Sequence, residues 1–342
     1  MTNKPRRVLL ISDFQLKIKA LYLDQIQKLG KGLIRLGYDV RWISYGGLLQ
    51  QLSPFKSRSM SAWFCKHKVD QQIATFIRHY QPDWVILGFA KFLDRQSVDL
   101  WRKISNSTSF IAFDVDLWPQ RHANRFETAS ALDIVLATNN GDCLNFYRDA
   151  GVKRCYFLPN CCDPDVEYRY PVGSEWYSEI LWTGKVQHKG GGDPVRNEII
   201  NRLLQYRGAR VYGCLGRPEV QGIDYLYAIS GAKIGISINA VNTIPLYHSD
   251  RFTQYAACGA MVLAKRVPQT ELLMEDKKHV VYFDTAEECM ELADWYLIHD
   301  TERQKIANAG MERCHHYFNM CTIAQAMVDI IEKGYTCQSW MQ

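Results

Sequence analysis

The chain has 342 residues, 47% of them hydrophobic and 23% charged, which excludes a disordered chain, a collagen-like repeat and a coiled coil. Its 41 lysines and arginines against 36 acidic residues give a net charge of +5. This charge suits a phosphate-bearing ligand but is too small by itself to indicate nucleic-acid binding. The eleven cysteines include no C-x-x-C pair, which favours reduced thiols and a cytoplasmic protein. No run approaches 18 apolar residues, so we expect no transmembrane segment.

Strand-like runs alternate with helix-like segments in the first half of the chain. A first strand is predicted at Arg7–Ser12, and helical spacing of leucines predicts a helix over 21–36 that stops at Gly37. Further elements are a helix at 69–80 and strands at 38–44, 84–88, 109–113, 133–138 and 154–158. The stretch 159–178, rich in proline and acidic residues, predicts the connection between two domains.

The same alternation restarts after this connection. Strands are predicted at 179–183, 209–212, 233–238, 261–264 and 280–283, and helices at 194–206, 285–299, 301–315 and 322–333. Alternating strands and helices imply parallel sheets with right-handed crossovers. We therefore expect an α/β protein with two doubly wound, Rossmann-like domains, 1–165 and 166–342, facing across a cleft. Ligands in such sheets bind beyond the carboxyl ends of the strands.

A glycine-rich segment follows the strand predicted at 179–183. Gly184, Lys185 and Lys189 precede a helix whose first turn holds Arg196. Glycines let the backbone approach a ligand, and lysines at a helix N-terminus favour an anion. The segment has neither a G-K-[ST] ending nor a G-x-G-x-x-G pattern, so it supports neither a Walker A loop nor a nicotinamide cofactor. The alternative is a flexible surface loop whose lysines are solvated, with Arg196 paired to an acid such as Glu198.

A second anion site is predicted where residues 247–263 read as loop, helix, turn and strand. Ser249 or Asp250 caps the helix, and Arg251 lies beside its free N–H groups. Gln254, about one turn further along the helix, is placed to hydrogen-bond a sugar hydroxyl. The alternative is an ordinary amphipathic helix.

The first half offers candidates for acid–base chemistry. Asp114 and Asp116 follow a predicted strand and precede His122, and Asp13 follows the first strand. One of Asp116, Asp13 and His122 could orient or deprotonate an acceptor hydroxyl. A metal clamp on a diphosphate is the less favoured use of the Asp-x-Asp pair, since the phosphate motifs lie in the other half, and we expect no metal. Turn capping with a surface histidine is the alternative.

The second half resembles the C-terminal half of GT-B fold glycosyltransferases of the group 1 type, and is most similar to the branch of bacterial spore-maturation and spore-coat glycosyltransferase-like proteins. The residues that carry the resemblance include 251–259 (RFTQYAACG), 280–284 (VVYFD), 286–288, 300–303, 306–310 (IANAG), 158–164 (LPNCCDP), 182–185 (WTGK) and Arg196. The first half matches this family in pattern alone.

The resemblance implies a hexosyl- or pentosyltransferase that moves a sugar from a nucleoside-diphosphate sugar to an acceptor hydroxyl, with no cofactor besides this co-substrate. By position, Lys185, Arg196 and Arg251 would hold the diphosphate, and the donor site would include the residues Gly184, Lys189, Tyr247, Ser249, Asp250 and Gln254. Gln254 stands where the family usually has a glutamate that binds the donor ribose. Leu246, eight positions earlier, stands where related retaining enzymes carry an acid. The implied acceptor is a polysaccharide, a glycoconjugate or a small molecule.

Two other functions stay open at this point. One is a glycosyltransferase acting on modified DNA bases, which the many lysines and arginines of the first half favour slightly. The other is a non-catalytic protein that binds a nucleotide sugar and has kept the fold, which the missing glutamates favour.

Overall fold

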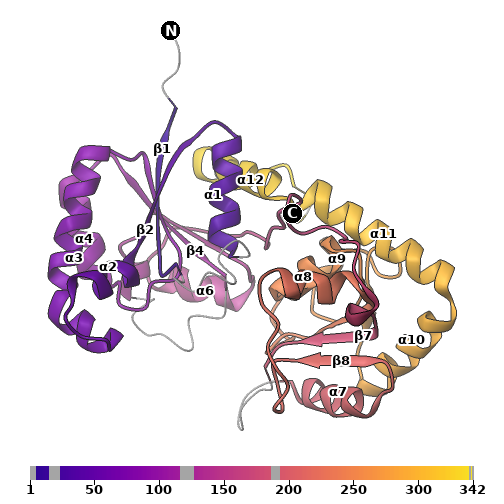
Figure 1. Ribbon diagram of the computed structural model, residues 1–342. Helices are drawn as coiled ribbons and strands as arrows, with labels where there is room; N and C mark the ends of the chain where they lie inside the picture. Colours follow the sequence, from indigo (N-terminus) through magenta and orange to yellow (C-terminus); the bar gives the residue numbers. More distant parts are fainter. Residues whose placement is uncertain (1–4, 15–23, 116–126, 186–192, 339, 341–342) are drawn as a thin grey trace. The chain divides into compact units, whose positions relative to one another are not determined.

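The computed structural model describes residues 5–14, 24–115, 127–185, 193–338 and 340. The chain forms two compact units (Figure 1). Unit 1 combines Met1–Pro159 with Ile323–Met341, and unit 2 comprises Asn160–Thr322. No helix in the described ranges is both long and apolar enough to span a membrane.

Unit 1 is built on a parallel sheet of six strands in the order β2-β1-β3-β4-β5-β6. The strands are β1 (Arg7–Ser12), β2 (Asp39–Ser44), β3 (Trp84–Leu87), β4 (Ser109–Asp114), β5 (Ile134–Ala137) and β6 (Arg154–Phe157). The helices are α1 (Gln25–Arg35), α2 (Tyr45–Leu52), α3 (Arg58–Tyr80), α4 (Arg95–Ile104), α6 (Asp142–Asp149) and α12 (Met320–Lys333). Leu9 and Val85 of the sheet pack with Val69 and Trp101 of α3 and α4 in one hydrophobic core.

Unit 2 repeats this plan with five parallel strands in the order β11-β10-β9-β7-β8. They are β7 (Ser178–Thr183), β8 (Ala209–Tyr212), β9 (Ala232–Ser237), β10 (Met261–Lys265) and β11 (Val281–Phe283). The helices are α7 (Pro194–Gln205), α8 (Ile223–Ser230), α9 (Asp250–Ala257), α10 (Ala286–Ile298) and α11 (Asp300–Tyr317). The prediction of an α/β chain with two doubly wound parallel sheets is confirmed.

Both sheets reverse direction beside their first strand. The chain moves from β1 outward to β2 and then returns to β3 on the other side of β1, and it does the same from β7 to β8 and back to β9. Ligands of doubly wound folds bind at such switch points, outside the carboxyl ends of the strands. The strand order therefore marks β1/β3 in unit 1 and β7/β9 in unit 2.

The structure differs from the predicted domains at the end of the chain. The predicted second domain runs from 166 to 342, whereas the division falls after Pro159 and residues 323–341 group with unit 1. The guanidinium of Arg154 at the start of β6 donates to the carbonyls of Ile330 and Ile331 in α12, and Arg6 forms an ion pair with Glu332. Such long-range contacts of the last helix are invisible in sequence patterning.

Two helices of unit 1 were missed or shortened by the prediction. The segment predicted as a helix at 69–80 begins eleven residues earlier, at Arg58, and α2 was not predicted. Gly46 and Gly47 near the start of α2 lower its helix propensity. The helix forms because the Ser44 side chain caps it by accepting from the Gly47 amide, and because Tyr45 and Leu49 are buried. All eleven cysteines are free thiols.

Candidate functional site

Two arginines lie at the switch point of the second sheet. The guanidinium of Arg251 donates from Nη1 to the Thr183 carbonyl (2.7 Å) and from Nη2 to the Ile238 carbonyl (2.6 Å). It therefore bridges the carboxyl ends of β7 and β9. Arg196, in the first turn of α7, donates from Nη2 to the Lys185 carbonyl at 2.7 Å. The structure thus brings together Arg196, Arg251 and the backbone of Gly184 and Lys185, as the sequence motifs predicted.

Both guanidinium groups lie over the indole of Trp182. The ring centroid is 5.2 Å from the Arg196 Cζ and 4.8 Å from the Arg251 Cζ. Trp182 is fully buried as part of β7, so it is a rigid platform that orients both side chains through cation–π contacts. Sequence reasoning assigned no role to Trp182, because an apolar residue within a strand is ordinarily part of the core.

The positive charge of this pair is not neutralised by a carboxylate in the described part of the chain. Neither arginine forms an ion pair there, and the Nε of each is buried without a hydrogen-bond partner. Burial, reinforced by the charge of Arg251, lowers the pKa of Arg196 to about 10. Buried charges are costly unless paired. The arrangement therefore has the charge and the fixed geometry to attract an anion.

Glycine is required where this anion site meets the backbone. Gly184 has a φ of +135°, and a Cβ there would overlap Nη1 of Arg251. Gly213, after β8, has a φ of +81°, a backbone conformation that L side chains rarely adopt. Lys185 is exposed at the same strand end. Lys189 lies outside the described residues, so its predicted role is a prediction still.

The start of α9 is held by a network of buried amides. Asn239, just after β9, accepts from the Ser249 amide (2.8 Å) and donates to the Tyr247 carbonyl (3.0 Å). Asn242 in turn donates to the Asp193 carboxylate (2.8 Å), which also caps α7 through the Val195 amide. The two helix N-termini that hold Arg251 and Arg196 are thereby tied together.

Ser249 occupies the N-cap position of α9, as predicted, but its side chain makes no capping hydrogen bond. Its Oγ is buried and has no partner. Asp250 is the first residue of the helix. The neighbouring His248 is almost fully buried with Nδ1 at 2.9 Å from the Leu246 carbonyl, and this burial lowers its pKa to about 4. The imidazole is therefore neutral at physiological pH, so His248 adds no positive charge at the start of α9.

Gln254 is buried on α9, and its Oε1 accepts a hydrogen bond from the Tyr225 hydroxyl at 2.9 Å. One position on, the fully buried Tyr255 hydroxyl contacts both the amide (3.0 Å) and the Oγ1 (2.7 Å) of Thr183. Burial raises the pKa of both tyrosines, so both hydroxyls keep their protons. Gln254 is thus oriented by a neutral partner.

A pocket of about 290 Å³ opens at this strand end. Its lining comprises Thr183, Gly184, Lys185, Tyr212, Gly213, Glu219, Val220, Tyr225 and Arg251. Glu219, in the segment between β8 and α8, contributes a carboxylate to this lining and is exposed. Sequence reasoning missed Glu219, Tyr225 and Asn239, since their relation to Arg251 depends on the strand order. The sequence offered one signal for Asn239, since this polar residue directly follows the strand predicted at 233–238.

The predicted acid–base residues belong to unit 1. Asp13, after β1, accepts from the Gly46 amide (2.7 Å) and the Lys91 amide (3.1 Å), so it holds the segments after β2 and β3 together at the first switch point. Asp116 and His122 lie outside the described residues. Asp114 is buried and accepts from the Tyr147 hydroxyl.

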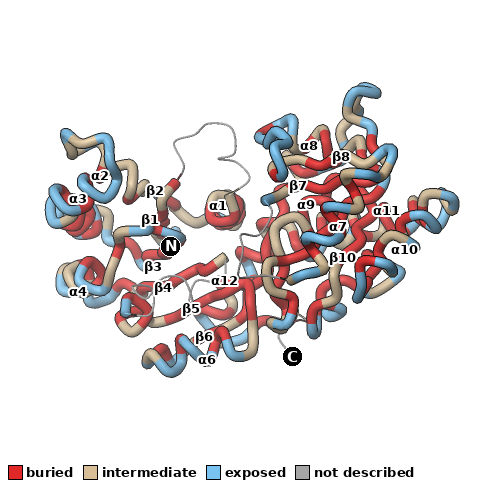
Figure 2. Tube along the Cα trace, turned by 90° about the horizontal axis from the view of Figure 1, so that it is seen from below, coloured by how far each residue is buried: buried red, intermediate tan, exposed pale blue. Residues whose placement is uncertain are grey.

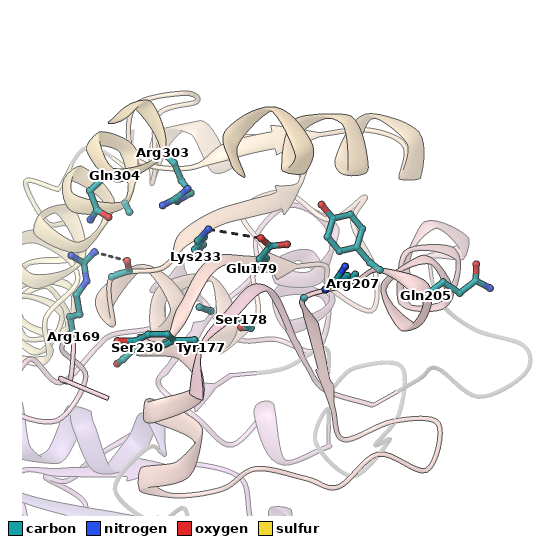
Figure 3. A pocket seen from close by; sticks show the side chains of 16 residues that line it. Arg169, Tyr177, Ser178, Glu179, Gln205, Arg207, Ser230, Lys233, Arg303 and Gln304 are labelled. Carbon is teal, nitrogen blue, oxygen red and sulfur yellow. Dashed lines mark hydrogen bonds and ion pairs between the residues drawn. The ribbon is translucent and has the colours of Figure 1, made fainter. Parts of the chain in front are cut away.

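A larger pocket, of about 930 Å³, lies at the opposite end of the second sheet (Figure 3). Its lining includes Ser178, the first residue of β7, Lys233, the second residue of β9, and the three arginines Arg169, Arg207 and Arg303. Lys233 lies 4.0 Å from the Glu179 carboxylate, and Arg169 donates to the Gly259 carbonyl at 2.6 Å (Figure 3). Being at the amino ends of the strands, this pocket does not include the predicted donor residues.

Comparison with protein families supports the assignment of the second half. Residues 196–341 match the family described as glycosyl transferase-like. This segment includes Arg196, Arg251 and Gln254. No curated protein matches the chain in a sequence search.

Solved structures match nearly the whole chain at low identity. HepE from Anabaena, crystallised with UDP and glucose, has a TM-score of 0.61 and 11% identity over 96% of this chain and 100% of its own. Sucrose-phosphate synthase from Thermosynechococcus elongatus has a TM-score of 0.61 and 14% identity over 96% and 98% of the two chains. A protein of Listeria monocytogenes that is proposed to be a UDP-N-acetylglucosamine 2-epimerase has a TM-score of 0.55 and 10% identity over 97% of each chain. The predicted GT-B architecture is confirmed; the spore-coat branch stays a prediction.

Proposed function

We propose that this protein transfers a sugar from a nucleoside-diphosphate sugar to an acceptor hydroxyl, without a metal ion, which the match of residues 196–341 to the glycosyl transferase-like family supports. The observation that carries the proposal is the arginine pair on Trp182 at the β7/β9 switch point, desolvated and unmatched by a carboxylate in the described residues. HepE, which shares the fold, binds UDP and UDP-glucose, so these are the first ligands to try.

The chemistry follows from where charge develops. As the glycosidic bond breaks, the leaving diphosphate gains negative charge. Arg196, Arg251 and Lys185 would stabilise this charge. The two guanidinium groups are held in fixed positions on Trp182, so they need little reorganisation during the reaction. Two guanidinium groups supply the positive charge that a divalent cation provides elsewhere, which supports a metal-independent reaction with no further cofactor.

The remaining donor contacts are proposed for one residue of the pocket lining and for residues of α9 and the segment before it. Gln254, fixed by Tyr225, would hydrogen-bond a ribose hydroxyl without charge assistance. Glu219 would supply the carboxylate that position 254 lacks. Ser249 Oγ, which has no partner, would donate to an oxyanion. Tyr247 and Asp250 complete the proposed donor side.

The acceptor side is proposed to use Asp116, Asp13 or His122, one of which would orient or deprotonate the acceptor hydroxyl. Asp13 already accepts from two backbone amides, which limits its freedom to take a proton. The acceptor is proposed to be a glycan, a glycoconjugate or a small molecule.

The test is a thermal-shift series with UDP, GDP, ADP, TDP, CMP and NAD, followed by transfer assays with the sugar forms of the nucleotide that binds. A ligand at about 100 times its Kd adds roughly 2.7 kcal/mol to the free energy of unfolding. We expect a selective shift with one nucleoside diphosphate, and its loss in Arg251→Ala. If no nucleotide shifts the midpoint, the donor site is refuted. If nucleotide binds but no donor is hydrolysed or transferred, the non-catalytic function replaces this proposal, as the glutamine at 254 would allow.

A further inference from the structure

The positive charge of the chain is concentrated in one stretch of unit 1. Residues 40–69 contain five lysines and arginines and no acidic residue. Removing these five from the chain's 41 basic residues leaves 36, the same as the number of acidic residues. The stretch therefore carries a charge of +5, and the rest of the chain has equal numbers of basic and acidic residues. The stretch comprises most of β2, α2 and the first half of α3.

The same stretch exposes large apolar side chains. Met60, Trp63 and Phe64 are 48%, 84% and 58% exposed. Positions i, i+3 and i+4 of a helix share one face, so these three side chains form a single stripe on the first turns of α3. We call Met60, Trp63 and Phe64 the apolar stripe. Single exposed apolar residues are ordinary, whereas a contiguous set on one helix face marks an interaction surface.

The stripe is distinct from the face by which α3 joins the core. Ala62, Cys65 and Val69 are buried against the sheet side of unit 1. Figure 1 shows α3 lying beside α2 and α4, and Figure 2 shows exposed segments along the outer side of these helices. Phe64 packs edge-on against Phe55, with ring centroids 5.6 Å apart, whereas Trp63 is almost fully exposed. Much of the apolar surface of the stripe is thus left to solvent.

Most of the adjacent positive charge is also uncommitted. Lys56, Arg58 and Lys68 are exposed, and within the described ranges none of them forms an ion pair. Lys66 differs, because its ammonium contacts the carboxylates of Asp70 (2.8 Å) and Asp94 (3.0 Å). Three free cations thus flank an apolar stripe.

We propose that the start of α3 binds the surface of a bilayer that contains anionic lipids, with the apolar stripe entering the headgroup region and Lys56, Arg58 and Lys68 contacting lipid phosphates. A helix face with tryptophan and phenylalanine beside lysine and arginine has the composition of an interfacial anchor. Duplex DNA would be drawn to the same cations, but it offers no apolar phase for Met60 and Phe64. The proposal does not depend on the proposed transferase activity, because it rests on residues of unit 1 that take no part in the donor site.

The experiment is vesicle co-sedimentation of the full-length protein, with phosphatidylcholine alone and with phosphatidylcholine containing 30% phosphatidylglycerol. We expect binding to the anionic vesicles to exceed binding to neutral ones by at least tenfold at low salt. Each cation near an anionic surface contributes about fivefold. The double variant Trp63→Ser/Phe64→Ser should lose most of the binding, as should Lys56→Glu/Arg58→Glu.

The matched control is Trp295→Ser/Ile298→Ser in α10. Trp295 and Ile298 are also exposed, at 44% and 79%, but acidic Glu291, Asp294 and Asp300 surround them in the sequence. This variant should bind vesicles like the parent chain. All of the exchanged side chains are exposed, so an unchanged circular-dichroism melt confirms that each variant is folded.

Three outcomes would overturn the proposal. They are equal sedimentation with neutral and anionic vesicles, unchanged sedimentation of both α3 double variants, and absence of vesicle binding together with a gel shift of duplex DNA that Lys56→Glu/Arg58→Glu abolishes. The last outcome would assign the surface to a nucleic acid.

Discussion

The two sheets share one strand order, yet their switch points carry opposite chemistry. At β1/β3 a carboxylate, Asp13, accepts hydrogen bonds from two backbone amides. At β7/β9 a guanidinium, Arg251, donates to two backbone carbonyls. Each charged side chain ties together the segments that leave the sheet. The charged group at the switch point is thus an anion in unit 1 and a cation in unit 2.

The comparison predicts its largest effect for Arg251→Ala. Removing the guanidinium should lower kcat/KM for sugar transfer by at least tenfold, because a hydrogen-bond donor directed at the developing negative charge of the diphosphate is lost. Arg207→Ala, at the amino end of the same sheet, is the matched control and should change kcat/KM by less than twofold. Equal losses in the two variants would mean that the site is not at the carboxyl end.

The free energy of unfolding of unit 2 should depend on pH because of His248, which lies beside the second switch point. Burial lowers its pKa to about 4, below its usual value near 6.5. The unfolded chain therefore binds a proton first as the pH falls, and stability is lost between pH 6.5 and 4. The full effect is up to about 3 kcal/mol. Denaturant titrations of His248→Gln should show a flatter profile over this range; an unchanged profile would show that His248 is not buried in its neutral form.

Asp13→Asn tests whether the first switch point serves structure or catalysis. The asparagine can accept from one amide but presents an NH₂ group to the other, which should cost about 1–3 kcal/mol of unfolding free energy. We expect a lower melting midpoint, with kcat of the folded enzyme reduced by less than tenfold. A hundredfold loss of kcat at an unchanged midpoint would instead assign Asp13 as the base.

Glu219→Gln should have the smallest effect and sharpens the account of the second switch point. Losing one charge-assisted hydrogen bond at an exposed position should raise the donor KM about fivefold. The same variant should discriminate less between a nucleotide and its 2′-deoxy form. If the parent chain already binds the two forms equally, Glu219 does not contact the ribose.

Local patterning predicted the strands well and selected residues that lie at the β7/β9 switch point. The predicted strand 209–212 coincides with β8, and Gly184, Lys185 and Arg196 were identified from a glycine-rich segment between a strand and a helix. These features depend on neighbours in sequence. The roles of Trp182 and Glu219 depend instead on the order of the strands, which hydrophobic periodicity does not encode. Asp13 follows a strand, as predicted, but its two amide partners come from segments 33 and 78 residues away.

The grouping of residues 323–341 with unit 1 has a consequence for the order of folding during synthesis. Chains fold domain by domain as they leave the ribosome. Unit 2 has all of its strands once residue 283 has emerged, whereas unit 1, although begun first, must wait for its last helix. The N-terminal unit would thus be the last to be finished, and a chain released early would carry the complete sheet of unit 2 while unit 1 still lacked its last helix.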